Sequence, residues 1–271
     1  MILVSRTKQL DSTKASFRTH LNYIKCIEKL LSQSNFYASR NGTPIRKDSE
    51  IKRFQKLYSV TLKSIKKDVE LSKEDSEFAV IIAPWFPVKC YYAIYYLESV
   101  LLHLIDGCTY GFSKGGHTGV RKKIYSLINL HIFFQQNDLD TIYNLGQVQS
   151  VKAIDCGTNA RTDYWKKQEC TQSVAKILMR YKLYDTKTGR KWNLHTKKHR
   201  IEKQQFLLTE RIVLIDFFYW YRIKANYRDL DYIDFENGIS SSEVLEYVET
   251  YYSAFDIYRL GLVKQINLLL K

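Results

Sequence analysis

The sequence predicts an all-α protein built as an up-and-down helical bundle. Only three prolines occur among 271 residues, so long segments are free of the residue that most strongly interrupts a helix. Several of these segments repeat apolar side chains at spacings of three and four residues, as one face of a helix requires. The composition, 45% hydrophobic and 26% charged, is typical of a globular chain with a sizeable core.

Two amphipathic helices are predicted in the N-terminal part of the chain. The first spans residues 10–38 and is ended by the Asn-Gly-Thr-Pro turn at residues 41–44. The second spans residues 49–69 and has an apolar stripe on one side. Its opposite face carries six basic residues: Lys52, Arg53, Lys56, Lys63, Lys66 and Lys67. Such a face is commonly only solvated, and it becomes a binding face when other basic elements lie beside it.

A core helix is predicted over residues 88–106, after a short apolar run at residues 78–82 and a bend at two prolines. Glu98 and His103 interrupt its apolar sequence, and such charged or polar breaks argue against a membrane span here and at Asp216. We interpret His103 as a hydrogen-bonded packing residue, because the residues on either side of it in the sequence are apolar.

A glycine-rich loop is predicted at residues 113–119, followed by a helix that begins near Val120. Glycine-rich loops that precede helices can hold a phosphate through backbone amides. This loop lacks the lysine-containing ending and the glycine spacing of nucleotide-binding motifs, so a flexible connection is the preferred interpretation. His117 lies in this loop.

The pattern loosens between residues 137 and 205, where helical segments are predicted at residues 138–145 and 172–184. A basic stretch follows, with a tryptophan that suits base stacking beside phosphate contacts. Its candidate nucleic-acid-binding residues are Lys187, Arg190, Lys191, Trp192, Lys197, Lys198 and Arg200. A solvated loop is the alternative. His195 and His199 have a chelating spacing, but the cysteines match no zinc motif, so no metal or cofactor is expected.

The most apolar stretch, residues 211–231, is predicted to be a central helix enclosed by its neighbours. It ends in polar residues that a buried scaffold would hold at a surface cleft, and Arg222, Lys224, Tyr227 and Arg228 are the candidates. The alternative is that Arg222 and Tyr227 only brace the turn before the last helix. That last helix begins at a capping box formed by Ser240 and Glu243.

The net charge of +14 favours a polyanionic partner, and nucleic acid is the simplest one. Solubility alone is the alternative explanation of the charge. The five cysteines are odd in number and widely spaced, so no disulfide framework is expected and a reducing, cytoplasmic location fits. No signal peptide and no membrane span are predicted.

Three segments, taken together, resemble the HEPN domain family. The family's tyrosine-bearing second helix is similar to residues 89–104 (KCYYAIYYLESVLLHL), and the connection after it is similar to residues 113–124 (SKGGHTGVRKKI). The family's Arg-x-x-Ala-Asp-Tyr segment and capped final helix are similar to residues 221–255, with Asn226 in place of the acid. The chain then divides into a first half of the bundle with its N-terminal helices (1–135), a basic insertion (136–205) and a second half (206–271).

The resemblance implies a homodimer that binds RNA. Ribonuclease members of the family, including toxins and defence proteins, use an arginine followed by a histidine to cleave RNA without a metal. Arg222 matches the arginine, but Tyr227 stands where the histidine would be, and a phenol of pKa about 10 is a poor base at neutral pH. His117 or His195 would then have to supply the imidazole. The alternative is a non-catalytic subunit that binds a nucleotidyltransferase-type or other protein partner.

Overall fold

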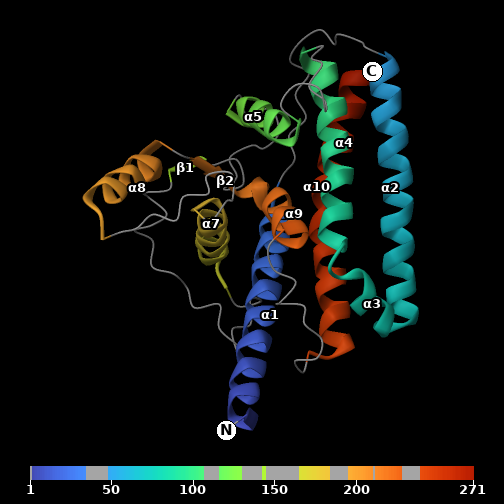
Figure 1. The fold of residues 1–271 in the computed structure, drawn as a ribbon. Helices are drawn as coiled ribbons and strands as arrows, with labels where there is room; N and C mark the ends of the chain where they lie inside the picture. The colour runs from blue at the N-terminus through green and yellow to red at the C-terminus, as the bar shows by residue number, and fades with distance from the viewer. Residues whose placement is uncertain are drawn as a thin grey trace.

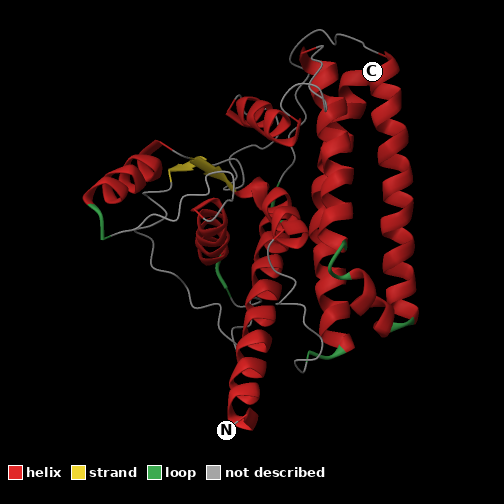
Figure 2. Ribbon diagram, viewed as in Figure 1, coloured by secondary structure: helices red, strands yellow, loops and turns green. Residues whose placement is uncertain are grey.

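The computed structural model describes residues 2–34, 48–106, 116–129, 142–144, 165–183, 195–209, 211–227 and 239–271. Nearly all of these residues are helical, and the described part of the chain has only two three-residue strands (Figure 2). The predicted all-α bundle is therefore confirmed.

Four long helices form the bundle: α1 (Ile2–Ser32), α2 (Asp48–Glu74), α4 (Phe86–Asp106) and α10 (Ser241–Leu270). Figure 1 shows α4 side by side with α2 and α10, and α1 lies along α10. Helices α2 and α4 run in opposite directions, since Asp68 pairs with Lys89 and Phe54 contacts His103. Helix α10 runs parallel to α4, since Phe86 contacts Tyr251 and Glu98 bonds to Tyr258.

The short helix α3 (Ser76–Ile82) turns the chain between α2 and α4. Asp75 caps it, because its carboxylate accepts a hydrogen bond of 2.9 Å from the backbone amide of Glu77. No single described helix is both long and apolar enough to cross a membrane. Taken together, α3 and α4 have the length and apolar composition of a membrane span, but a 65° bend separates them. Most of α4 is buried in the centre of the bundle.

A second group of shorter elements packs beside the bundle in Figure 1. It consists of α5 (Gly116–Asn129), β1 (Ile142–Asn144), α7 (Lys167–Leu183), α8 (Lys197–Thr209), β2 (Arg211–Val213), the 3-10 turn η2 (Leu214–Asp216) and α9 (Phe217–Tyr227). The two strands pair antiparallel, with Ile142 opposite Val213 and Asn144 opposite Arg211. Helix α7 packs on α1, and α8 contacts β1. Of the described parts of residues 136–205, α7 therefore lies against the bundle, β1 pairs with β2, and α8 contacts β1.

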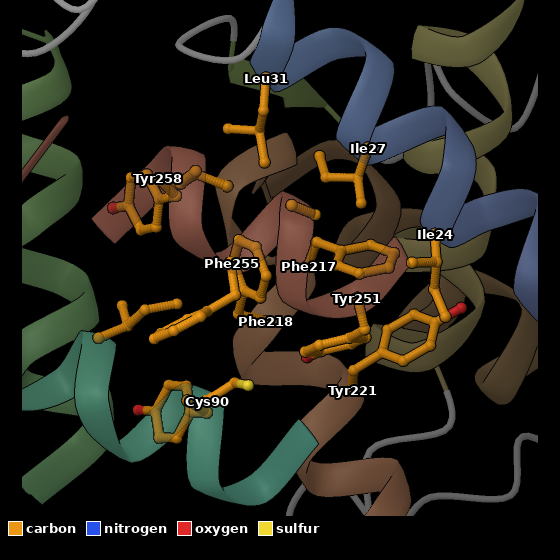
Figure 3. Close-up of a cluster of buried hydrophobic side chains, with 14 of the residues drawn as sticks. Ile24, Ile27, Leu31, Cys90, Phe217, Phe218, Tyr221, Tyr251, Phe255 and Tyr258 are labelled. Atoms are coloured by element: carbon orange, nitrogen blue, oxygen red, sulfur yellow. The ribbon is translucent and has the colours of Figure 1, made fainter. Parts of the chain in front are cut away.

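The core where α9 meets α1, α4 and α10 is aromatic (Figure 3). Phe217 stacks on Tyr221 with ring centroids 4.1 Å apart, and Phe218 lies nearly parallel to Tyr258 at 5.8 Å. Tyr251 of α10 contacts Phe217, Phe218 and Tyr221. These buried rings fix the first turns of α9, and so they fix the direction in which its next turn presents Arg222.

Two predictions of local structure are wrong. Residues 211–213 of the predicted central helix form β2, and the α-helix begins only at Phe217. Residues 142–144, predicted within a helical segment, form β1. The reason is the same in both places, because each short segment gains backbone hydrogen bonds from the other, and the sequence periodicity of a short apolar run does not separate strand from helix. The helices at α1, α2, α4 and α7 and the Ser240 capping box are confirmed, although α1 begins eight residues and ends six residues earlier than predicted, α2 ends five residues later and α7 begins five residues earlier.

Candidate functional site

Arg222 lies on the second turn of α9 with its side chain against α4. The central carbon of its guanidinium is 4.9 Å from the centroid of the Tyr91 ring and 5.5 Å from that of Tyr219. Only 7% of the residue is exposed. It forms no ion pair with the described residues, and its Nε has no hydrogen-bond partner among them. Arg222 is therefore a buried cation held by aromatic faces, which attract a positive charge without neutralising it.

His117, the second residue of α5, contacts the same tyrosine. Its Nδ1 is 3.0 Å from the hydroxyl of Tyr91, and its ring is 4.5 Å from the ring of Tyr95. Burial raises the pKa of Tyr91 well above its usual value of 10.0, while the charges of Arg121 and Arg222 oppose this rise. Tyr91 therefore stays a neutral phenol. Its hydroxyl can donate to Nδ1 or accept from it, so it orients the imidazole in either tautomer.

The start of α5 adds a further positive potential. Gly116 opens this helix with a φ of 50°, a backbone conformation that favours glycine. The first turn of α5 contains no acidic residue, so the partial positive charge of the helix N-terminus is not offset there. Residues 116–119 of the predicted glycine-rich loop thus belong to the helix, and residues 113–115 lie outside the described part of the chain.

A buried ion cluster holds α5 in place one turn after His117. Arg121 donates from Nε to Asp216 Oδ1 at 2.8 Å and from its terminal nitrogens to Asp216 and to Glu98. Tyr258 donates to the same Glu98 oxygen at 3.1 Å. Burial raises the pKa of Asp216 to about 6, and the charge of Arg121 opposes this rise. The cluster joins α4, α5, η2 and α10, so it positions the helix that carries His117.

The structure joins some of the predicted residues and separates others. It brings Arg222 and His117, 105 positions apart in the sequence, into contact with the same residue, Tyr91. It does not bring His195 to them. His195 lies exposed two residues before α8, a helix that contacts β1 and stands apart from α4 and α9 in Figure 1. The same exposed helix carries Lys197, Lys198 and Arg200.

The remaining predicted residues lie at the edges of the described ranges or outside them. Lys224 and Tyr227 are in α9, and Tyr227 is its last residue, but their side chains are not described. The residues outside the described ranges are Lys187, Arg190, Lys191, Trp192 and Arg228. His103 is buried with its ring 5.6 Å from that of Phe54, which agrees with a packing role.

Four residues of the site were not predicted from the sequence: Tyr91, Glu98, Arg121 and Asp216. A usable indication was present, since Glu98 and Asp216 are lone acids inside apolar stretches, and a buried carboxylate requires a cation. Among the described residues no three histidine, cysteine or acidic side chains are grouped in a way that would hold a metal ion. The groups that can act at the site are a buried guanidinium and an oriented imidazole, which suit anion binding and proton transfer.

No family model, no curated protein and no solved structure matches the chain.

Proposed function

We propose that the protein binds RNA at the Arg222–His117 site and cleaves it without a metal ion, as the resemblance to HEPN ribonucleases implies. The observation that carries the proposal is the state of Arg222. A buried charge normally has a carboxylate partner, because burial of an unpaired charge is costly. Arg222 has none among the described residues, although Arg121, which is also buried near Tyr91, has two. An arginine that has no acidic partner in the described part of the chain, and that contacts the same tyrosine as an imidazole, fits a phosphate that arrives from outside.

The proposed reaction is attack of the ribose 2′-oxygen on the adjacent phosphorus. A bond forms between the 2′-oxygen and phosphorus, and the bond from phosphorus to the 5′-oxygen of the next nucleotide breaks. The imidazole of His117 takes the proton of the 2′-hydroxyl, and a proton from solvent goes to the departing 5′-oxygen. The guanidinium of Arg222 stabilises the negative charge that grows on the phosphoryl oxygens. The products are a 2′,3′-cyclic phosphate and a 5′-hydroxyl.

Variants of two histidines separate this proposal from the alternative in which His195 supplies the imidazole. In buffer with EDTA, wild-type protein should cleave a mixed RNA substrate. His117→Ala should reduce the rate by about 10²- to 10⁴-fold, the range for loss of a general base. His195→Ala is the matched control and should cleave at the wild-type rate. Loss of cleavage in His195→Ala with full activity in His117→Ala would contradict the site proposed here.

A second candidate function is an RNA-binding subunit that does not cleave and that docks on a nucleotidyltransferase-type protein. The observation that favours it is Tyr227, which occupies the position of the family's histidine. Wild-type protein that binds RNA with a steep salt dependence but leaves it intact in every buffer would support this candidate over the nuclease.

The net charge of +14 is consistent with both candidates, since each requires a polyanionic ligand. A homodimer and a role in a toxin or defence system remain parts of the proposal that the resemblance alone supports. Sedimentation at several protein concentrations measures the first of these directly.

A further inference from the structure

Two partly exposed tyrosines on α4 begin at the Arg222–His117 site and lead away from it. Tyr92 and Tyr96 are one helical turn apart, and their ring centroids are separated by 6.2 Å. The ring of Tyr92 lies 5.5 Å from the ring of His117. Both side chains are only partly buried, so part of each ring reaches the surface. Successive aromatic rings at a surface are the platforms on which unpaired nucleic-acid bases stack.

The second tyrosine reaches helix α2. The ring of Tyr96 is 6.2 Å from that of Phe54, and the neighbouring Arg53 is close enough for its charge to counter the rise that burial causes in the pKa of Tyr96. The Arg53 side chain is 60% exposed, and its pairing with Glu50 at 3.6 Å is a surface contact within the same helix. Such pairs are weak, so Arg53 remains available to a phosphate.

Arg53 stands at the margin of a strongly basic surface, the α2 basic face, made of Lys52, Arg53, Lys56, Lys63, Lys66 and Lys67. All six are exposed, and no acidic residue lies between Lys52 and Lys67 in the sequence. At 3.6 residues per turn they fall within an arc of roughly 140° and extend for about 22 Å. Four of them (Lys52, Lys56, Lys63 and Lys66) form no ion pair with the described residues. Charge of one sign without partners is suited to a polyanion.

We propose that the substrate is single-stranded RNA, and that the strand leaves the Arg222–His117 site across Tyr92 and Tyr96 and continues along the α2 basic face. This inference rests on the proposed function, because it starts from the phosphate that Arg222 binds. Two bases stack on the tyrosine rings, and the phosphates that follow contact Arg53 and the lysines. Duplex RNA does not fit this path, since its bases are already stacked on each other and present no free face.

An anionic membrane is the other partner that a basic helix can recognise, but α2 does not have the required shape. Helices that lie on membranes insert an exposed apolar face between the lipids. The apolar face of α2 is packed in the core through Ile51, Phe54, Ile65 and Val69. On the exposed face of α2, Val60 is the single large apolar residue that is mostly exposed, at 62%, so this face has no apolar surface to insert.

The proposed path across Tyr92 and Tyr96 is tested with two probes of different length. One is the dinucleotide uridylyl-adenosine, which fills only the Arg222–His117 site. The other is a 12-residue single strand of uridine and adenosine with 2′-O-methyl groups, which cannot be cleaved and is long enough to reach α2. Tyr92→Leu/Tyr96→Leu should weaken binding of the 12-mer by about 10- to 100-fold, as loss of base stacking does. The fold decrease in 12-mer affinity should be at least ten times larger than any fold decrease in the rate of dinucleotide cleavage. Tyr92→Phe/Tyr96→Phe keeps the rings and should bind the 12-mer as wild type does.

The basic face is tested through the salt dependence of 12-mer binding. Lys56→Gln/Lys63→Gln should lower the slope of log affinity against log salt by about 1.4, since each contact to a single strand contributes about 0.7. The charge-matched control is Lys166→Gln/Arg180→Gln, which removes the same charge from exposed positions beside and on α7, on the other side of the bundle. It should leave the slope within the error of the wild-type value.

Four results would overturn this inference. The first is 12-mer affinity unchanged in both the tyrosine and the lysine variants while the dinucleotide is still cleaved, which would leave the proposed function standing and remove the path. The second is equal affinity for a duplex of the same length.

The third is binding to phosphatidylserine vesicles that the lysine changes abolish while 12-mer affinity stays constant, which would assign the α2 basic face to a membrane. The fourth is wild-type protein that neither cleaves the dinucleotide nor binds the 12-mer, which would remove the proposed function as well.

Discussion

Two arginines are buried near Tyr91, and their guanidinium groups have different kinds of partner. Arg121 is enclosed by Glu98 and Asp216, and a hydroxyl from α10 shares the same cluster. Arg222 contacts tyrosine rings and has no acidic partner among the described residues. A buried cation that is fully paired serves the fold, since removal of one partner leaves the others uncompensated. A buried cation without an acid is free to pair with a ligand. Arg121 therefore has the partners of a residue that stabilises the fold, and the lack of an acidic partner among the described residues is the ground for the ligand-binding role proposed for Arg222.

The largest expected effect is on stability and concerns Arg121. Replacing it in Arg121→Met leaves Glu98 and Asp216 buried without their cation, so the free energy of unfolding should fall by about 3–5 kcal/mol. Urea denaturation followed by circular dichroism measures this. Arg222→Met makes the same substitution at the other arginine and should change the free energy of unfolding by less than about 1 kcal/mol, because the cation–π interaction that is lost is offset by removal of a buried charge that has no acidic partner among the described residues. Equal decreases in the two variants would remove the distinction between the arginines.

The next effect is on activity and concerns Arg222. Arg222→Met should lower kcat/KM for uridylyl-adenosine by about 10²- to 10³-fold, which is the usual result of removing one transition-state charge donor. Arg222→Lys keeps the charge but loses the planar, two-pronged donor, so it should recover only part of the rate. The measurement is initial rates in EDTA on proteins shown to melt at the wild-type temperature. Wild-type kcat/KM in Arg222→Met would refute a direct role.

A third effect is on the pH dependence of stability and concerns the acid beside Arg121. The pKa of Asp216 is about 6 in the folded chain, compared with an ordinary value of 3.8. The folded state therefore binds the carboxyl proton more tightly than the unfolded state does. The stabilisation is complete below pH 3.8 and is lost as the pH rises through 6. Its size is up to about 3 kcal/mol, at about 1.4 kcal/mol for each pH unit of difference.

Unfolding of wild type and Asp216→Asn at pH 4, 5, 6 and 7 isolates this contribution. The difference in unfolding free energy between the two proteins should change by about 2 kcal/mol between pH 4 and 6 and be constant above about pH 7. A difference that does not vary with pH would mean that Asp216 stays ionised beside Arg121 throughout.

The smallest effect concerns Tyr91, which contacts both Arg222 and His117. Tyr91→Phe keeps the aromatic face under Arg222 and removes only the hydroxyl at 3.0 Å from His117. The loss of one neutral hydrogen bond should cost about 1 kcal/mol in stability. A looser imidazole should lower kcat by up to about tenfold and shift the pH profile of kcat, with little change in KM. A variant with an unchanged pH profile would show that Tyr91 does not position His117.

The comparison also explains what the sequence could predict. Helices α2, α4 and α10 have long periodic or capped sequences, so their existence follows from local patterns such as the Ser240 capping box. The β1–β2 pair does not, because two three-residue strands that lie far apart in the sequence depend on each other and not on their own periodicity. Arg222 and His117 were each suspected from the sequence. Their meeting at Tyr91 depends on the angle at which α5 and α9 approach α4.

The ion cluster was missed for a related reason. Glu98, Arg121 and Asp216 come from three separate elements, and only tertiary packing pairs them. In the sequence, Glu98 and Asp216 stand out only as interruptions that argue against a membrane span. In a buried helix the same interruptions predict a partner cation elsewhere in the chain, and that rule would have directed attention to Arg121.

The most direct test of the difference between the two arginines is a crystal structure of the protein with 2′-deoxyuridylyl-adenosine, which lacks the attacking hydroxyl and stays intact. The account predicts the phosphate within hydrogen-bonding distance of the Arg222 guanidinium and close to the imidazole of His117, with Arg121 still bound to Glu98 and Asp216. A phosphate bound along α8, or an Arg222 side chain turned away into an ion pair with a carboxylate, would contradict it.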